Sequence, residues 1–155
     1  MNRALSKLSS YAWVVVALLW PVVMLNYLDR QMLSSIRVSI RADIPSIAND
    51  QDFGALMAVF MWVYAFLSPV GGFIADKFNR RWTVIGSLFV WSAVTWLTGH
   101  AQTYSQMLGC RAFMGISEAF YFPAALALIA DFHTGKTRAR AVGIHQSGLY
   151  VGLAL

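Results

Sequence analysis

Residues 53–81 read FGALMAVFMWVYAFLSPVGGFIADKFNRR and contain the clearest structural signal in the chain. The run from Phe53 to Ala75 has no charged residue, and a helix needs about 20 apolar residues, at a rise of about 1.5 Å each, to cross a bilayer. Three basic residues, Lys77, Arg80 and Arg81, follow almost at once. The stretch therefore predicts a membrane-spanning helix that ends in a short basic turn.

The composition of the whole chain also indicates a membrane protein. Of its 155 residues, 58% are hydrophobic and only 12% are charged, whereas a soluble domain has about 25% charged residues. In water, so short a domain would have to cover most of its surface with polar groups, so we expect the excess apolar surface to face lipid. The net charge of +5 comes from basic residues in short clusters between apolar runs, which argues against a nucleic-acid partner.

Reactive side chains are few. Cys110 is the only cysteine, so no internal disulfide can form, and the three histidines are scattered along the chain. The sequence contains no nucleophile-and-base set and no cofactor motif. We therefore expect no enzyme activity, no metal site and no cofactor.

The apolar pattern recurs and predicts an all-α, polytopic membrane helical bundle. The first run lacks the cleavage site of a signal peptide, so we interpret it as an uncleaved first helix. Proline inside three of the runs is compatible with a helix in a membrane. The fifth run is still apolar at Leu155 and is too short to cross. The expected helices cover residues 11–40, 53–75, 82–99, 106–130 and 141–155.

The basic residues of alternate loops set the predicted orientation. One side has only Arg37 and Arg41, offset by three nearby acids. Because cytoplasmic loops carry excess lysine and arginine, we expect the other side, with the amino terminus, to be cytoplasmic in the inner (plasma) membrane of a bacterium. The basic residues on that side are Arg3, Lys7, Lys77, Arg80, Arg81, Lys136, Arg138 and Arg140.

Four ionisable residues, Asp29, Arg30, Arg111 and Glu118, fall at membrane depth. A charge at the centre of a membrane helix costs about 2.5–3.5 kcal/mol, so the set would cost on the order of 10 kcal/mol unless paired, hydrated or neutralised. Arg111 and Glu118 are two turns apart on one helix face, about 10 Å along the axis. Two interpretations stay open: salt bridges that fix helix packing, or a central cavity where arginine binds an anion and a carboxylate carries a proton.

In the second interpretation Glu118 is the better proton carrier, because Asp29 adjoins Arg30 and should stay ionised longer. Substrate and proton would then compete for the same arginine, which is a simple route to coupled transport. Other polar residues in or near helices are weaker candidates for hydrogen bonds to a ligand, since packing and interfacial anchoring are common roles for such side chains. They are Asn26, Tyr27, Tyr64, Tyr121, His145 and Gln146.

The segment from Gly72 to Arg81 resembles the loop motif between the second and third helices of the major facilitator superfamily. That motif has a glycine, an acid four residues later, a basic residue, a second glycine and two more basic residues. Here Asn79 replaces the second glycine, and asparagine is the next best residue for a left-handed helix end. The resemblance implies a latch that holds neighbouring cytoplasmic helix ends and stabilises the outward-facing state. Its implied members are Gly72, Asp76, Lys77, Arg80, Arg81 and Asp131.

Two further segments narrow the resemblance. Residues 26–30, NYLDR, and residues 111–124, RAFMGISEAFYFPA, are similar to those of the anion:cation symporters, which include proton-coupled carriers of sugar acids, sialate and other organic anions. The same signatures resemble the spinster-type transporters of lipid-like molecules. The resemblance implies substrate binding by Arg30, Arg111, Tyr64, Asn26 and Gln146, and proton coupling through Asp29 and Glu118.

Transporters of this superfamily have twelve helices in two bundles, with the site between the bundles. The resemblance therefore implies that the chain is an incomplete amino-terminal six-helix bundle, whose partners are the bilayer, protons, a small anionic substrate and a missing carboxy-terminal half. We expect a fragment that is inactive alone. The alternative is a non-transporting scaffold or regulator that keeps this helical framework, favoured if the reading frame ends naturally at Leu155.

Overall fold

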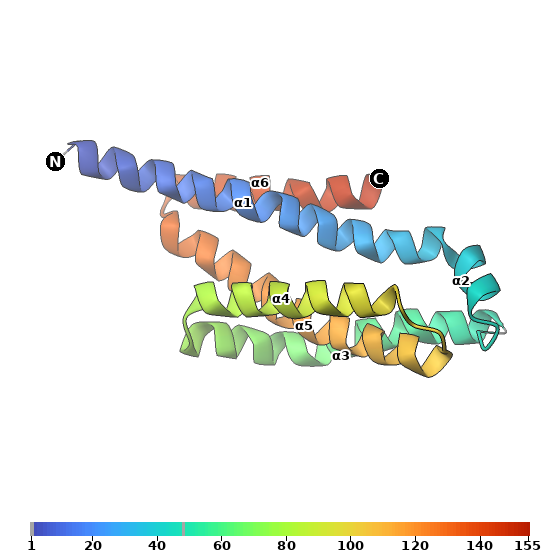
Figure 1. Cartoon of the computed structure of the whole chain (residues 1–155). Helices are drawn as coiled ribbons and strands as arrows, with labels where there is room; N and C mark the ends of the chain where they lie inside the picture. The colour runs from blue at the N-terminus through green and yellow to red at the C-terminus, as the bar shows by residue number, and fades with distance from the viewer. Residues whose placement is uncertain (1, 48) are drawn as a thin grey trace. The chain divides into compact units, whose positions relative to one another are not determined.

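The structure, a computed structural model, describes residues 2–47 and 49–155, with side chains from Ser10 onward. The side chains of Arg3 and Lys7, which contribute to the predicted orientation, lie outside that part. The described residues form helices and no strand, which confirms the all-α prediction. In chain order (Figure 1) the helices are α1 (Asn2–Ser35), α2 (Arg37–Asp43), α3 (Asp50–Lys77), α4 (Arg80–Thr98), α5 (Tyr104–Phe132) and α6 (Lys136–Ala154).

The chain divides into two compact units, which are described separately below. The first unit comprises Met1–Ile36 and Leu126–Leu155, and the second comprises Arg37–Ala125. The first unit therefore contains α1, the end of α5 and α6. The second unit contains α2, α3, α4 and most of α5.

The first predicted helix is interrupted. The apolar run predicts one helix over residues 11–40, but α1 ends at Ser35 and the short α2 begins at Arg37. At the break, the hydroxyl of Ser35 donates to the carbonyl oxygen of Gln31 at 3.2 Å, a bond by which serine competes with the helical backbone. After the break, Arg37 and Arg41 both form ion pairs with Asp50 at the start of α3, at 2.9 Å for Arg41. These ion pairs anchor α2 within the second unit.

The starts of α3 and α4 follow from their capping residues rather than from hydrophobicity. α3 begins at Asp50, three residues before the predicted start, because the side chain of Asn49 accepts a hydrogen bond from the backbone N–H of Asp52 at 2.8 Å. Two acids in this first turn also suit the positive end of the helix dipole. The prolines interrupt none of the three helices in which they lie, namely Pro21 in α1, Pro69 in α3 and Pro123 in α5.

Three helices of the described residues are long and apolar enough to cross a membrane. Their spans are Ser10–Ser35, Asp50–Lys77 and Tyr104–Phe132. α4 does not reach that hydropathy, although the sequence predicts a spanning helix there, because it begins with Arg80 and Arg81 and contains several serines and threonines. Its 19 residues are still about 28 Å long, close to the roughly 30 Å of the hydrocarbon core.

In the first unit, α1 and α6 lie side by side (Figure 1) and approach closely at two glycines of α6. A Cβ atom on Gly148 would lie 2.8 Å from the carbonyl oxygen of Trp20, and one on Gly152 would meet the backbone of Met24. The indole Nε1 of Trp20 also donates to the hydroxyl of Ser147 at 3.0 Å. The two glycines thus allow close contact between α1 and α6.

In the second unit, glycines on both helices bring α3 and α5 together. A Cβ atom on Gly71 of α3 would meet the backbone carbonyl of Ala119, and one on Gly115 of α5 would lie 2.8 Å from the carbonyl oxygen of Phe60. Because backbone atoms cannot rotate away as side chains do, neither glycine position has room for a larger residue. A small apolar core joins α3, α4 and α5 and consists of Phe60, Val94 and Met114, with Trp91 and Cys110 packed against it.

The turn between α3 and α4 consists of only Phe78 and Asn79. The left-handed conformation predicted for Asn79 is wrong, because its φ of −68° and ψ of 112° are extended. Asn79 is instead the N-cap of α4, and its side-chain oxygen accepts a hydrogen bond from the backbone N–H of Arg81 at 3.1 Å, which stabilises the helix start. Among the described residues a positive φ occurs only at Gly135, at 56°, just before α6.

Candidate functional site

Of the three charged residues of α5, Arg111 and Glu118 lie on a buried face, whereas Asp131, in the last turn, is exposed. The side chain of Arg111 is 4% exposed and that of Glu118 is 1% exposed, and their separation of two turns places them on the same side of the helix. Met114 lies between them, also buried, and its Sδ accepts a hydrogen bond from Nη1 of Arg111 at 3.3 Å. In the apolar 18-residue stretch of each span, half of the residues are buried in α5, against 28% in α1 and 17% in α3. The most enclosed of the three spans therefore contains both a cation and an acid.

Tyr121 belongs to the same face, although its residue type alone indicates packing. It follows Glu118 by three residues, so the two side chains are neighbours on the helix surface. The ring is buried, and the hydroxyl has no hydrogen-bond partner among the described residues. A buried polar group of this kind normally bonds to water or to a ligand. Its spacing from Glu118 is the one sequence signal that identifies it.

α3 contributes Tyr64 to the second unit. This side chain is half-buried and stacks on Phe60, with ring centroids 6.2 Å apart and an angle of 13° between the rings. Phe60 is also the residue whose backbone contacts Gly115 of α5. Tyr64 thus lies one helical turn from the point where α3 and α5 touch.

The first unit contains the remaining residues that are predicted to bind substrate or protons. On α1, Asn26 is buried, whereas Asp29 and Arg30 are half-buried. The guanidinium of Arg30 lies over the ring of Tyr27, 4.6 Å from the ring centroid, in a cation–π contact. On α6, Gln146 is half-buried, and its amide oxygen has no hydrogen-bond partner among the described residues.

A comparison with known protein families identifies the family of this chain. The sequence profile described as Major Facilitator Superfamily matches residues 11–155. The chain belongs to the major facilitator superfamily. The predicted family is thereby confirmed, and the chain is a membrane protein of a transporter family.

Two curated relatives within this superfamily have informative names. The chain is 28% identical to the protein spinster of Drosophila melanogaster over 151 residues, which cover 97% of this chain and 25% of the relative. It is 29% identical to the D-galactonate transporter of Escherichia coli O6:H1 over 142 residues, which cover 92% of this chain and 33% of the relative. The chain thus spans a third or less of the length of these relatives.

Solved structures show the same helical fold. A bacterial homologue of the human lysosomal transporter Spinster, in an inward-facing and unoccupied conformation, superposes with a TM-score of 0.80 at 28% identity. The match covers 94% of this chain and 29% of the solved chain. The occupied inward-facing form of that homologue gives a TM-score of 0.81. This agreement confirms the predicted class of fold.

The charged residues of the basic turn between α3 and α4 make contacts with nearby residues of the chain. Nη2 of Arg80 forms an ion pair with Oδ1 of Asp76 at 2.9 Å, which joins the end of α3 to the start of α4. The ammonium of Lys77 lies 5.8 Å from the ring centroid of Phe73, and Arg81 is exposed. Asp131, the predicted acidic partner, is exposed and belongs to the first unit.

The glycine of the predicted latch has no steric requirement for glycine. A Cβ atom on Gly72 would meet only the Cβ of Pro123, at 3.9 Å, which is an ordinary contact. The preceding residue, Gly71, is the one that the contact with Ala119 restricts. The two adjacent glycines therefore differ in what the fold demands of them.

Proposed function

We propose that this chain is part of a secondary active transporter that couples proton movement to the transport of a small organic anion such as a sugar acid. The burial of Arg111 and Glu118 on one face of α5 is the observation that carries the proposal. A charge inside a membrane helix is expensive, and such residues commonly belong to substrate paths and proton relays. Arg111 offers a cation to a substrate carboxylate, and Glu118 offers a group that can accept a proton.

The two residues together give a direct mechanism for symport. When Glu118 is ionised, its negative charge attracts Arg111 and competes with an anionic substrate. Protonation of Glu118 removes this competition, so Arg111 binds the substrate carboxylate more strongly. Loss of the proton on the other side of the membrane restores the competition and favours release. Proton and substrate therefore travel in the same direction.

We assign the other polar candidate residues to substrate binding or proton binding. In the second unit, Tyr121 and Tyr64 would bond to substrate oxygens. In the first unit, Asp29 would provide a second proton-binding carboxylate. Substrate contacts there are assigned to Arg30, Asn26 and Gln146.

The name of the D-galactonate transporter supports a sugar acid as the substrate class, because such a molecule carries the carboxylate that a buried arginine would bind. The spinster-type transporters of lipid-like molecules are the second candidate. The structural similarity to the bacterial Spinster homologue favours them. An uptake assay with both kinds of probe separates the two candidates.

With an inward-directed proton gradient, we expect proteoliposomes that contain the full-length protein to accumulate labelled D-galactonate. The Arg111→Gln variant should bind the sugar acid about a hundredfold more weakly, because it removes the attraction to the carboxylate and leaves Glu118 buried without its cation. Arg138→Gln, at an exposed position in the first turn of α6, is the matched control. Uptake of a lysophospholipid but not of the sugar acid would favour the spinster-type candidate instead.

The basic loops give a second testable expectation, about topology. With single cysteines in a cysteine-free background, residues 43–52 and 100–105 should react with a membrane-impermeant thiol reagent in intact cells. Residues 77–81 and 136–140 should react only after the membrane is opened, because we propose that these basic loops are cytoplasmic. Labelling of residues 77–81 in intact cells would reverse the proposed orientation. It would also remove the cytoplasmic latch of Gly72, Asp76, Lys77, Arg80, Arg81 and Asp131.

A further inference from the structure

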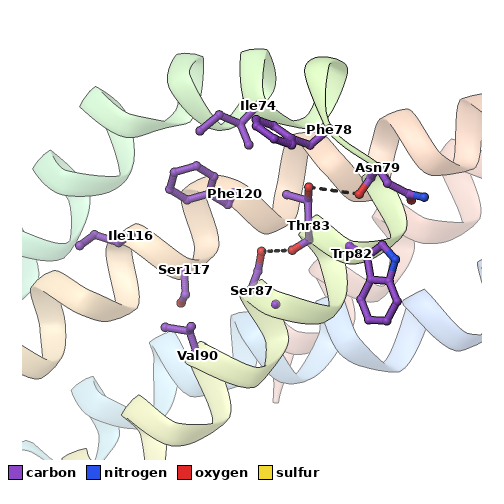
Figure 2. Close-up of a pocket in the computed structure, with 11 residues that line it drawn as sticks. Ile74, Phe78, Asn79, Trp82, Thr83, Ser87, Val90, Ile116, Ser117 and Phe120 are labelled. Atoms are coloured by element: carbon purple, nitrogen blue, oxygen red, sulfur yellow. Dashed lines mark hydrogen bonds between the residues drawn. The ribbon is translucent and has the colours of Figure 1, made fainter.

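A cavity of about 580 Å³ lies in the second unit, between the end of α3, the first half of α4 and the middle of α5 (Figure 2). This volume is within the usual range for sites that bind small molecules. Its rim residues Phe78, Trp82 and Val90 are all exposed. α5 contributes Ile116, Ser117 and Phe120. Ile116 and Phe120 lie two positions before and after Glu118, which is about 200° around the helix axis. The cavity is therefore on the opposite face of α5 from the charged residues of the candidate transport site.

The hydroxyl groups of the cavity wall are already bonded. Thr83 donates to the carbonyl oxygen of Asn79 at 3.4 Å, and Ser87 donates to that of Thr83 at 2.5 Å, as the dashed lines in Figure 2 show. Ser117 donates to the carbonyl oxygen of Met114 at 2.9 Å. Each hydroxyl hydrogen is used within its own helix, so the wall offers an occupant mainly apolar contact. Such a wall suits a hydrocarbon chain better than a polar solute.

The length of the cavity matches one leaflet of a bilayer. From Asn79 to Val90, α4 rises by about 16 Å, and half of a hydrocarbon core of about 30 Å is about 15 Å. The cavity occupies only the half of α4 next to the basic turn.

The end of the cavity next to the turn has the features of a membrane interface. Trp82 is 67% exposed, and tryptophan is enriched where lipid headgroups meet the hydrocarbon core. Lys77 and Arg81 are exposed and adjoin the lining residues Phe78 and Trp82 in sequence. Basic clusters at the ends of membrane helices attract anionic lipid headgroups.

The cavity has an apolar wall, the length of one leaflet and a basic end. From these three features we propose that it binds one acyl chain of an anionic phospholipid from the surrounding bilayer. The phosphate of that lipid would lie near Lys77 and Arg81, at the end where Trp82 marks the interface. The chain would extend along α4 toward Val90. The proposal concerns a lipid site distinct from the transport path and does not depend on the identity of the transported substrate.

Gly86 allows the cavity to be filled without disturbing the fold. It lines the cavity, and a Cβ atom at this position would meet no atom within 4 Å. Gly143 on α6 is equally open and does not line the cavity, so Gly143→Leu is the matched control for Gly86→Leu. The purified protein would be titrated with phosphatidylglycerol or phosphatidylcholine, and bound lipids would be counted by native mass spectrometry.

We expect Gly86→Leu to weaken the tightest phosphatidylglycerol binding step by about tenfold, whereas Gly143→Leu leaves that step unchanged. The double variant Lys77→Gln/Arg81→Gln should lose the preference for phosphatidylglycerol over phosphatidylcholine, and the control Lys136→Gln/Arg138→Gln should keep it. Equal binding by Gly86→Leu and the unmodified protein would overturn the proposal. Loss of helical circular dichroism in Gly86→Leu alone would also overturn it, because the cavity would then be filled by protein.

Discussion

Glu118→Gln is expected to abolish proton-driven accumulation of the substrate while substrate exchange continues. Glutamine keeps the size of the side chain and its capacity for hydrogen bonds, but it cannot release or take up a proton. Under the proposed mechanism the variant resembles permanently protonated Glu118, so Arg111 still binds the anion and only the response to the pH gradient is lost. The expected accumulation ratio falls to the value measured without a gradient.

The measurement compares two assays on the same proteoliposomes. Uptake of labelled D-galactonate against its gradient, with an imposed pH difference, reports coupling, and exchange of internal for external substrate at equal pH reports binding and movement. Both are divided by the amount of folded protein. Asp43→Asn is the control, because Asp43 is an exposed acid at the end of α2. If Glu118→Gln concentrates substrate as the unmodified protein does, Glu118 is not the coupling group, and the buried charges are structural.

Gly71→Ala is expected to destabilise the fold, whereas Gly72→Ala should be neutral or slightly stabilising. Alanine favours a helix interior over glycine by about 1 kcal/mol, and both substitutions receive that gain. At residue 71, however, the new methyl group meets the backbone carbonyl of Ala119, so α3 must move away from α5. Overpacking of this kind costs about 1–3 kcal/mol even where side chains can adjust.

The two alanine variants can be compared by thermal unfolding in detergent, followed by circular dichroism. A melting temperature several degrees lower for Gly71→Ala than for Gly72→Ala is the expected result. Equal melting temperatures would mean that α3 and α5 are not in close contact at this point. Because the two residues are neighbours in one helix, differences in expression or helix propensity cannot explain a difference in melting temperature between the two variants.

Most of the helices could be predicted from the sequence, because long apolar runs are a strong and local signal. The shared face of Arg111 and Glu118 also follows from a spacing of seven residues within one uninterrupted helix. The start of α3 was harder to predict from the sequence, since it depends on the side chain of Asn49 and not on hydrophobicity. The position of α2 after the break likewise involves ion pairs to Asp50, which lies at the start of the next long helix.

Features that depend on contacts between helices were beyond the reach of the sequence. Gly71 and Gly72 are adjacent residues of the same type in one apolar run, and only the distance to Ala119 distinguishes them. The residue type of Tyr121 indicates packing, whereas its hydroxyl is buried without a hydrogen-bond partner among the described residues. The cavity beside α4 combines residues from three helices, from Ile74 to Phe120, so no local sequence pattern predicts it.

The two-residue turn between α3 and α4 has a consequence for biogenesis. α4 is less apolar than the three clear spans, so on leaving the ribosome it would be a weak signal for insertion by the translocon. Phe78 and Asn79 leave almost no slack between the two helices, and the Asp76–Arg80 ion pair closes the turn. α4 is therefore expected to enter the bilayer as the second arm of a helical hairpin, with the hydrophobicity of α3 driving the insertion of both.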